Sequence, residues 1–113
     1  MAASGVPRAA ANVVANGGAV YKGLVKTVSR KPDYEELTEE SLEAILAMFG
    51  RSKVKVAFRV RSKELSATMI GAGLTIWEDL RGVDLDWLEN VAGVPHFEAL
   101  AFFRFLDDSA HAA

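Results

Sequence analysis

The sequence predicts an α+β fold in which a small antiparallel sheet packs against three or four helices. Two stretches predict the sheet: an N-terminal hairpin centred on Asn16-Gly17, and a strand over 53–61 in which apolar and basic residues alternate. A capped stretch over 38–49 with apolar residues at helical spacing predicts the first helix. Together these patterns favour a small sheet that packs against helices.

The first expected element is the N-terminal hairpin. Asn16-Gly17 follows the short stretch 12–15, and Asn-Gly is favoured in type I′ turns because both central residues need a positive φ. The stretch 19–29 is rich in Val, Tyr, Leu and Thr, which predicts the second strand. A helix over Pro7–Ala15 is the alternative at this end of the chain.

The next element is a helix over 38–49. Asp33 and Glu36 match a capping box, and Thr38 offers a second N-cap. Gly50 is expected to end the helix as its C′ residue. The apolar face has the spacing i, i+3, i+4, i+7 and consists of Leu42, Ile45, Leu46 and Phe49.

The stretch 53–61 alternates strictly, which is typical of a half-buried strand. Its expected inner face consists of Val54, Val56, Phe58 and Val60, and its expected outer face carries Lys53, Lys55, Arg59 and Arg61. Same-face residues of a strand lie about 6.6–6.8 Å apart, so the basic side chains would form a row.

Helical patterns predominate after residue 62. A helix over 62–81 with Ser62 as N-cap is favoured, although a strand over 68–77 remains the alternative because two glycines weaken the helix. Asp84 is expected to cap a short helix that has Leu85, Leu88 and Val91 inside and ends at Gly93 and Pro95.

The stretch 96–106 is apolar almost all round, which predicts a central helix or part of an interface. A strand over 99–106 stays open because periodicity does not distinguish the two.

Composition excludes several classes of site. The 113 residues include no cysteine, which excludes disulfides, thiolate zinc sites and a cysteine nucleophile. This absence fits a reducing, cytoplasmic location, and no apolar run approaches the about 20 residues that a membrane span needs. We expect one domain over 1–113, with loose ends at about 1–8 and 108–113.

Charge is segregated along the chain although the net charge is only −2. Residues 1–32 carry five bases and no acid, and 33–50 carry six acids and no base. Residues 51–63 carry six bases and no acid, and 64–113 carry nine acids and two bases. Such blocks indicate a dipolar surface, unless they neutralise one another in the fold.

The sequence offers few residues suited to catalysis, so we expect no enzymatic activity, no cofactor and no metal site. His96, paired with Asp86 or Glu89, is the one acid–base pair that the sequence offers, and no nucleophile motif accompanies it. The acidic residues Asp79, Asp84, Asp86 and Glu89 lack the spacing of a calcium loop, which favours a solvated face that caps helices.

Two surfaces remain as candidate sites. The first is a nucleic-acid site on the predicted basic strand, formed by Lys53, Lys55, Arg59, Arg61 and Lys63. The alternative is a face that only keeps the protein soluble, because no aromatic side chain alternates onto it. The second is a partner interface formed by Phe97, Leu100, Phe102, Phe103 and Phe105, unless these residues are simply the core.

No motif is specific to a known family, so function is inferred from these surfaces. The leading hypothesis is a non-catalytic interaction or assembly module that oligomerises or docks to a protein partner. The alternative is RNA or DNA binding through the basic strand, and an enzyme with a His–carboxylate pair is the least favoured. No membrane partner and no small-molecule ligand are expected.

Overall fold

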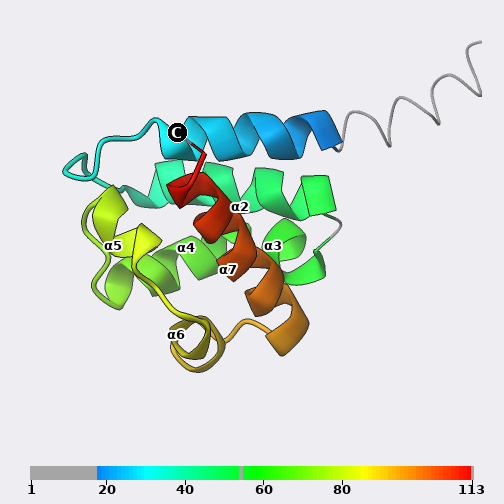
Figure 1. Cartoon of the computed structure of the whole chain (residues 1–113). Coiled ribbons are helices and arrows are strands. Elements are labelled where there is room, and N and C mark those ends of the chain that lie inside the picture. Colours follow the sequence, from blue (N-terminus) through cyan, green and yellow to red (C-terminus); the bar gives the residue numbers. More distant parts are fainter. Residues whose placement is uncertain (1–17, 54, 113) are drawn as a thin grey trace, which may run out of the picture.

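The computed structural model describes residues 18–53 and 55–112, and this part of the chain is built from helices (Figure 1). The elements in order are a helical segment 18–29, α2 (Glu39–Lys53), α3 (Val56–Val60), α4 (Ser62–Gly71), α5 (Trp77–Arg81), α6 (Leu85–Asn90) and α7 (His96–Ala110). The predicted α+β fold is therefore wrong. The β-type pairing found among the described residues is one isolated antiparallel bridge between Glu36 and Ile76.

The helical segment 18–29 replaces the expected second strand of the hairpin. Leu24 and Val28 are buried, and Tyr21 and Val25 are half-buried, which is the i, i+3, i+4, i+7 spacing of a helix face. The other expected features of this end, the turn at 16–17, the alternative helix 7–15 and the loose end 1–8, lie outside the described residues.

Tyr21 connects this helical segment to the C-terminal end of α7 by a hydrogen bond and a ring contact. Its hydroxyl donates a hydrogen bond to Asp108 Oδ2 at 2.7 Å, and its ring lies 5.8 Å from that of Phe105. Burial, followed by this hydrogen bond, raises the pKa of the Tyr21 phenol because both favour the neutral form. α7 continues to Ala110 with Ser109 buried, so three residues of the expected loose end are helical.

The helix predicted over 38–49 is confirmed. Thr38 caps it, because its Oγ1 accepts the backbone N–H of Ser41 at 3.1 Å, and the Ser41 hydroxyl oxygen accepts the N–H of Thr38 in return. Asp33 does not act as the cap and pairs with Arg81 instead. The predicted apolar face, Leu42, Ile45, Leu46 and Phe49, is buried as expected.

α2 runs through Gly50 and ends only at Lys53. A Cβ at Gly50 would lie 2.5 Å from the backbone nitrogen of Arg59 and 2.8 Å from the carbonyl carbon of Phe58. This glycine therefore permits close contact between α2 and α3, and it does not end the helix as predicted.

The strand predicted over 53–61 is wrong. Lys53 ends α2, the stretch 56–60 is α3, and Arg61 precedes α4. Within α3 only Ala57 and Phe58 are buried, whereas Val56 and Val60 face solvent, so burial does not follow the alternation. α3 then packs on α2 through Phe58, whose ring lies 5.1 Å from that of Phe49.

The helix favoured over 62–81 is partly confirmed. α4 occupies Ser62–Gly71 and α5 occupies Trp77–Arg81, with a turn between them in place of the alternative strand 68–77. Ser62 is the first residue of α4 and not its N-cap, which is Arg61. The short helix α6 is confirmed, since Asp84 Oδ1 accepts the Trp87 N–H at 2.8 Å, but Val91 is exposed.

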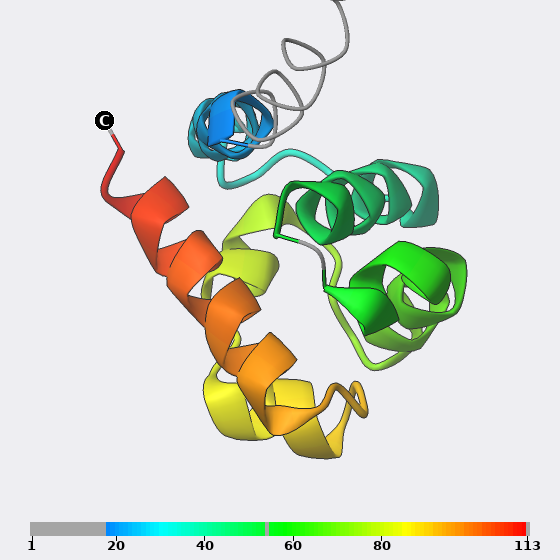
Figure 2. The ribbon, with the colours of Figure 1, turned by 90° about the vertical axis from the view of Figure 1, so that its right-hand side faces the viewer.

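The helix predicted from residue 96 is confirmed as α7, and it contributes to an aromatic core. Four phenylalanines, Phe49, Phe58, Phe102 and Phe105, are fully buried, and the centroids of neighbouring rings lie 4.9–5.6 Å apart. The pairs include edge-to-face and stacked arrangements, and offset-stacked and edge-to-face geometries are the favoured ones for aromatic rings. Figure 2 shows α7 on one side of the molecule, α2 to α4 on the other, and the segment 18–29 above both.

Candidate functional site

The surface around α3 is unusual because it exposes apolar side chains. Val56 is 58% exposed and Val60 is 71% exposed, and the i, i+4 spacing puts both on one face of α3. Their neighbours Ala57 and Phe58 are buried and hold the helix on the core. Two β-branched side chains thus face solvent on a helix whose opposite side is packed.

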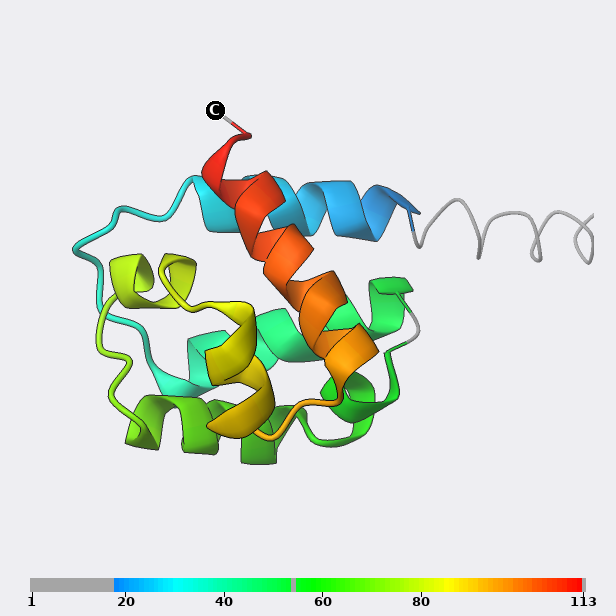
Figure 3. The ribbon, with the colours of Figure 1, turned by 60° about the horizontal axis from the view of Figure 1, so that its bottom comes forward.

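The N-terminal end of α3 is held by a carboxylate from α7. Glu98 Oε1 accepts the backbone N–H of Ala57 at 2.8 Å, which satisfies a donor that α3 leaves without an intrahelical acceptor. A negative charge at a helix N-terminus is also favoured by the helix dipole. This bond brings the first turns of α3 and α7 together, as Figure 3 shows for the green and orange helices.

Phe97 belongs to the same first turn of α7 and is 79% exposed. It is the chain neighbour of Glu98, as Val56 is the chain neighbour of Ala57. The contact between Glu98 and Ala57 therefore places an exposed aromatic side chain at the same end of the molecule as the exposed valines of α3.

The predicted basic residues gather at this end but do not form a row. Lys53 ends α2, with Nζ 4.0 Å from the centre of the Tyr21 ring. Lys55 is the N-cap of α3, Arg59 is exposed on α3, and Lys63 is exposed in the first turn of α4. The chain connection between the helices, and not a strand, brings these cations together.

Arg61 differs from the other cations because it is already paired. Its Nη2 lies 2.8 Å from Glu64 Oε1, and Nε donates to the same carboxylate at 3.3 Å. The hydrogen bond to Glu64 and the charge of that carboxylate raise the pKa of Arg61, and the guanidinium in turn lowers the pKa of Glu64. Within the described part of the chain, Lys55, Arg59 and Lys63 form no such ion pair.

We call this area the α3 surface and define it by its exposed apolar residues and the three cations beside them. Its members are Lys55, Val56, Arg59, Val60, Lys63 and Phe97. The sequence identified three of these residues as a basic strand and one as part of an aromatic interface. It did not bring the two groups together, because their contact depends on Glu98.

The predicted interface on α7 is divided by the fold. Phe102 and Phe105 are fully buried in the aromatic core and are not accessible to a partner. Leu100 is half-buried, Phe103 is 37% exposed, and Phe97 is the most exposed of the set. The core therefore takes two of the five predicted interface residues.

The acidic residues noted in the sequence are engaged within the fold. Asp79 Oδ2 accepts from the backbone N–H and the hydroxyl of Thr75 and from the N–H of Ile76, at 2.8–3.2 Å. These bonds, led by the backbone bond from Thr75, lower the pKa of Asp79. Asp84 caps α6, and Asp86 accepts from the Asn90 side chain at 2.7 Å.

The candidate acid–base pair is formed, between His96 and Glu89. His96 Nδ1 lies 2.9 Å from Glu89 Oε2, which links α7 to α6. Among the described residues, no serine or threonine hydroxyl is hydrogen-bonded to this histidine, so the pair lacks a nucleophile. No group of three or more His, Asp or Glu side chains in the same part of the chain is arranged to hold a metal ion.

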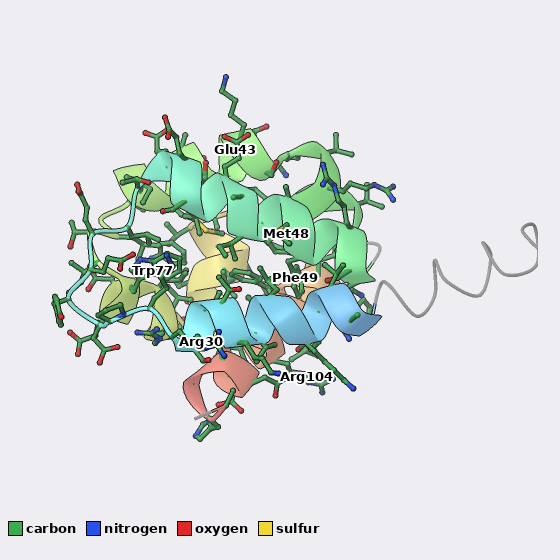
Figure 4. The ribbon with its side chains drawn as sticks, turned by 90° about the horizontal axis from the view of Figure 1, so that it is seen from above. Arg30, Glu43, Met48, Phe49, Trp77 and Arg104 are labelled. Atoms are coloured by element: carbon green, nitrogen blue, oxygen red, sulfur yellow. The ribbon has the colours of Figure 1, made fainter. Side chains whose placement is uncertain are left out.

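At the opposite end, the loop 31–38 is tied to α5. Leu37 N–H donates to Thr75 O at 2.9 Å, and the backbone N–H groups of Trp77 and Glu78 donate back to the loop at 3.0–3.1 Å. The indole N–H of Trp77 also donates to Glu35 at 3.2 Å. Figure 4 shows Trp77 inside the molecule, whereas Glu43 points away from it.

Arg81 of α5 binds both the loop 31–38 and the end of the helical segment 18–29. Its guanidinium, with the side chain only 14% exposed, pairs with Asp33 and donates to the carbonyl oxygens of Val28 at 2.7 Å and Lys31 at 2.6 Å. The cation thereby binds carbonyls at the C-terminal end of the helical segment 18–29, where a positive charge is favoured.

The loop exposes a tyrosine that no sequence motif marked. Tyr34 is 82% exposed and lies within Asp33-Tyr34-Glu35-Glu36, next to the acidic first turn of α2. We call this area the acidic end and define it as Tyr34, Glu36, Glu39 and Glu40. The signal available in the sequence was one aromatic residue surrounded by carboxylates.

Comparison of the chain with protein-family models, with curated proteins and with solved structures gives no match. Of the helices in 18–53 and 55–112, none is long and apolar enough to cross a membrane.

Proposed function

We propose that this chain is a non-catalytic interaction and assembly module whose α3 surface binds an acidic, amphipathic segment of a protein partner. One observation carries the proposal: Val56 and Val60 are exposed on α3 beside cations that form no ion pair with a described residue, and Glu98 brings the helix turn of exposed Phe97 to the same end.

Burial of apolar surface would drive the binding. Each Å² of apolar surface removed from water contributes about 25 cal/mol, so covering two valines and a phenylalanine is favourable by several times the thermal energy. Exposed apolar residues that lie together mark interfaces, whereas singly scattered ones are ordinary, and aromatic residues and arginine are enriched at interfaces.

The cations specify the partner's charge. Arg59 lies between Val56 and Val60 in sequence, and Lys55 and Lys63 flank them. Complementary carboxylates would accelerate association and exclude basic partners. The matching segment is therefore one in which Asp or Glu alternates with Leu, Phe or Tyr.

Fluorescence anisotropy tests this proposal with a fluorescein-labelled peptide in which Glu alternates with Leu and Phe. We expect binding that Val60→Ser, Phe97→Ser and Arg59→Glu each weaken by about tenfold, equivalent to about 1.4 kcal/mol. All three side chains are exposed, so circular dichroism should show that each variant keeps the fold.

Two controls sharpen the experiment. Val91→Ser removes another exposed apolar side chain, at the C-cap of α6, and Lys22→Glu reverses a charge on the segment 18–29. Neither should change the affinity. A peptide in which Lys replaces Glu should not bind. Equal binding of both peptides, or equal loss with control and test variants, would contradict the proposal.

Single-stranded nucleic acid is the second candidate, favoured by one observation. Phe97 supplies an exposed aromatic ring at the same end as the cations, and sequence-tolerant binders stack bases on such rings. Three phosphate contacts predict a log–log salt slope of about −2. Anisotropy of a labelled random-sequence RNA at about 50 and 200 mM salt measures this slope. Binding that is lost in Arg59→Glu and Phe97→Ser would replace the protein partner by a nucleic acid.

A further inference from the structure

We infer that the partner of the α3 surface is a second copy of this chain, which contributes its acidic end. The inference rests on the proposed function, because it uses the same binding surface and names what binds there. It predicts head-to-tail self-association.

The two surfaces are complementary in charge and in apolar character. The α3 surface presents valines and a phenylalanine among Lys55, Arg59 and Lys63. The acidic end presents Tyr34 beside carboxylates, and Glu36, Glu39 and Glu40 form no ion pair within the described residues. A tyrosine ring can cover exposed valines and also accept a cation–π contact from an arginine such as Arg59.

The α3 surface and the acidic end of one molecule cannot contact each other, because they lie at opposite ends of α2. α2 begins at the acidic end with Glu39 and Glu40 and finishes near α3 with Arg51 and Lys53. Its 15 residues form a rod about 22 Å long. Figure 1 shows the loop 31–38 and α3 at opposite sides of the molecule.

A contact between two different surfaces of successive copies is heterologous. Where the rotation between successive copies does not close a ring, each added copy leaves one α3 surface and one acidic end available, and the assembly grows as an open chain. The predicted product is a concentration-dependent series of oligomers and not a dimer of fixed size.

The loop that carries Tyr34 is held in one conformation by bonds within the fold. The main-chain bonds between 33–37 and 75–78, together with the Arg81 guanidinium, fix the loop that carries Tyr34. A fixed loop loses little conformational freedom on binding, so less of the contact energy is spent on ordering it.

The test uses two variants of the full chain, each with one surface altered. The first, Arg59→Glu with Val60→Ser, changes the α3 surface. The second, Tyr34→Ser with Glu36→Lys, changes the acidic end. All four side chains are exposed, and circular dichroism with thermal melting checks that both variants fold as the unaltered chain does.

Light scattering coupled to size exclusion measures the mass over about 5–500 µM. We expect the average mass of the unaltered chain to rise with concentration beyond that of a dimer, and to fall at high salt because the charges are screened. Each variant alone should remain monomeric. An equimolar mixture of the two variants should form a dimer and nothing larger, because each variant retains the surface that the other lacks.

Four outcomes would overturn the inference: a monomeric unaltered chain, a plateau at a dimer, no dimer in the mixture, or self-association that survives in either variant. The peptide experiment separates these failures from failure of the proposed function. If the Glu-rich peptide binds the α3 surface while the chain stays monomeric, the docking surface stands and its partner is a different protein.

Discussion

The loop 31–38 and the short helix α3 both connect longer helices, yet their charged groups are used differently. Around the loop, Arg81 and Glu35 form bonds to backbone or aromatic groups, and the guanidinium is largely buried. Around α3, Arg59 is exposed beside exposed valines, and no ion pair within the described residues involves it. The buried Arg81 guanidinium thus completes the fold at one end of α2, whereas the exposed Arg59 guanidinium near the other end remains available for binding.

The largest expected effect separates the two faces of α3. Phe58→Ala should lower the free energy of unfolding by about 3–5 kcal/mol, because it opens a cavity in the aromatic core. Val60→Ala, two positions later on the exposed face, should change it by less than about 0.5 kcal/mol. Chemical denaturation followed by circular dichroism measures both. Equal losses would mean that α3 is packed on both faces and that the α3 surface does not exist.

A smaller effect is expected at the opposite end. Arg81→Met should cost about 2–3 kcal/mol, because two backbone carbonyl oxygens and the Asp33 carboxylate lose their donor. Arg104→Met on the exposed part of α7 is the matched control and should cost less than about 0.5 kcal/mol. The same denaturation experiment compares them. If both variants lose equally, the loop is not attached through this guanidinium.

The smallest effect depends on pH and concerns Asp79. Its pKa is lowered in the folded state below the 3.8 of a free Asp, because the carboxylate accepts bonds from Thr75 and Ile76. Its contribution to stability is therefore present above that value and lost as pH falls through the lower folded value. The stability difference between the unaltered chain and Asp79→Asn should be present at about pH 7 and shrink at about pH 2. A difference that does not change with pH would exclude the carboxylate charge as its source.

Local signals in the sequence predicted α2 and α6 well. Thr38 and Asp84 act as caps as expected, and Leu42 to Phe49 face the core at helical spacing. These features depend on residues within one or two turns of each other, so a sequence pattern contains all the necessary information.

The α3 region could not be predicted in this way. The alternation over 53–61 is typical of a strand, but Glu98, 41 residues from Ala57, stabilises a helix there. The side of α7 that faces the core could not be predicted from the sequence either, because phenylalanines occur on more than one face of this helix. The segment 18–29 did carry a helical spacing at Tyr21, Leu24, Val25 and Val28, but the Asn-Gly signal before it led to the prediction of a strand there.

The most direct test of the account is a nuclear magnetic resonance titration of the chain with the Glu-rich peptide, at a concentration where the chain is monomeric. If the α3 surface is the docking site, backbone amide signals of residues 55–63 and of Phe97 should shift with saturation. Signals of the loop 31–38, which is engaged within the fold, should stay in place. Shifts confined to that loop, or no shifts at all, would contradict the claim that the exposed valines and cations around α3 form a binding surface.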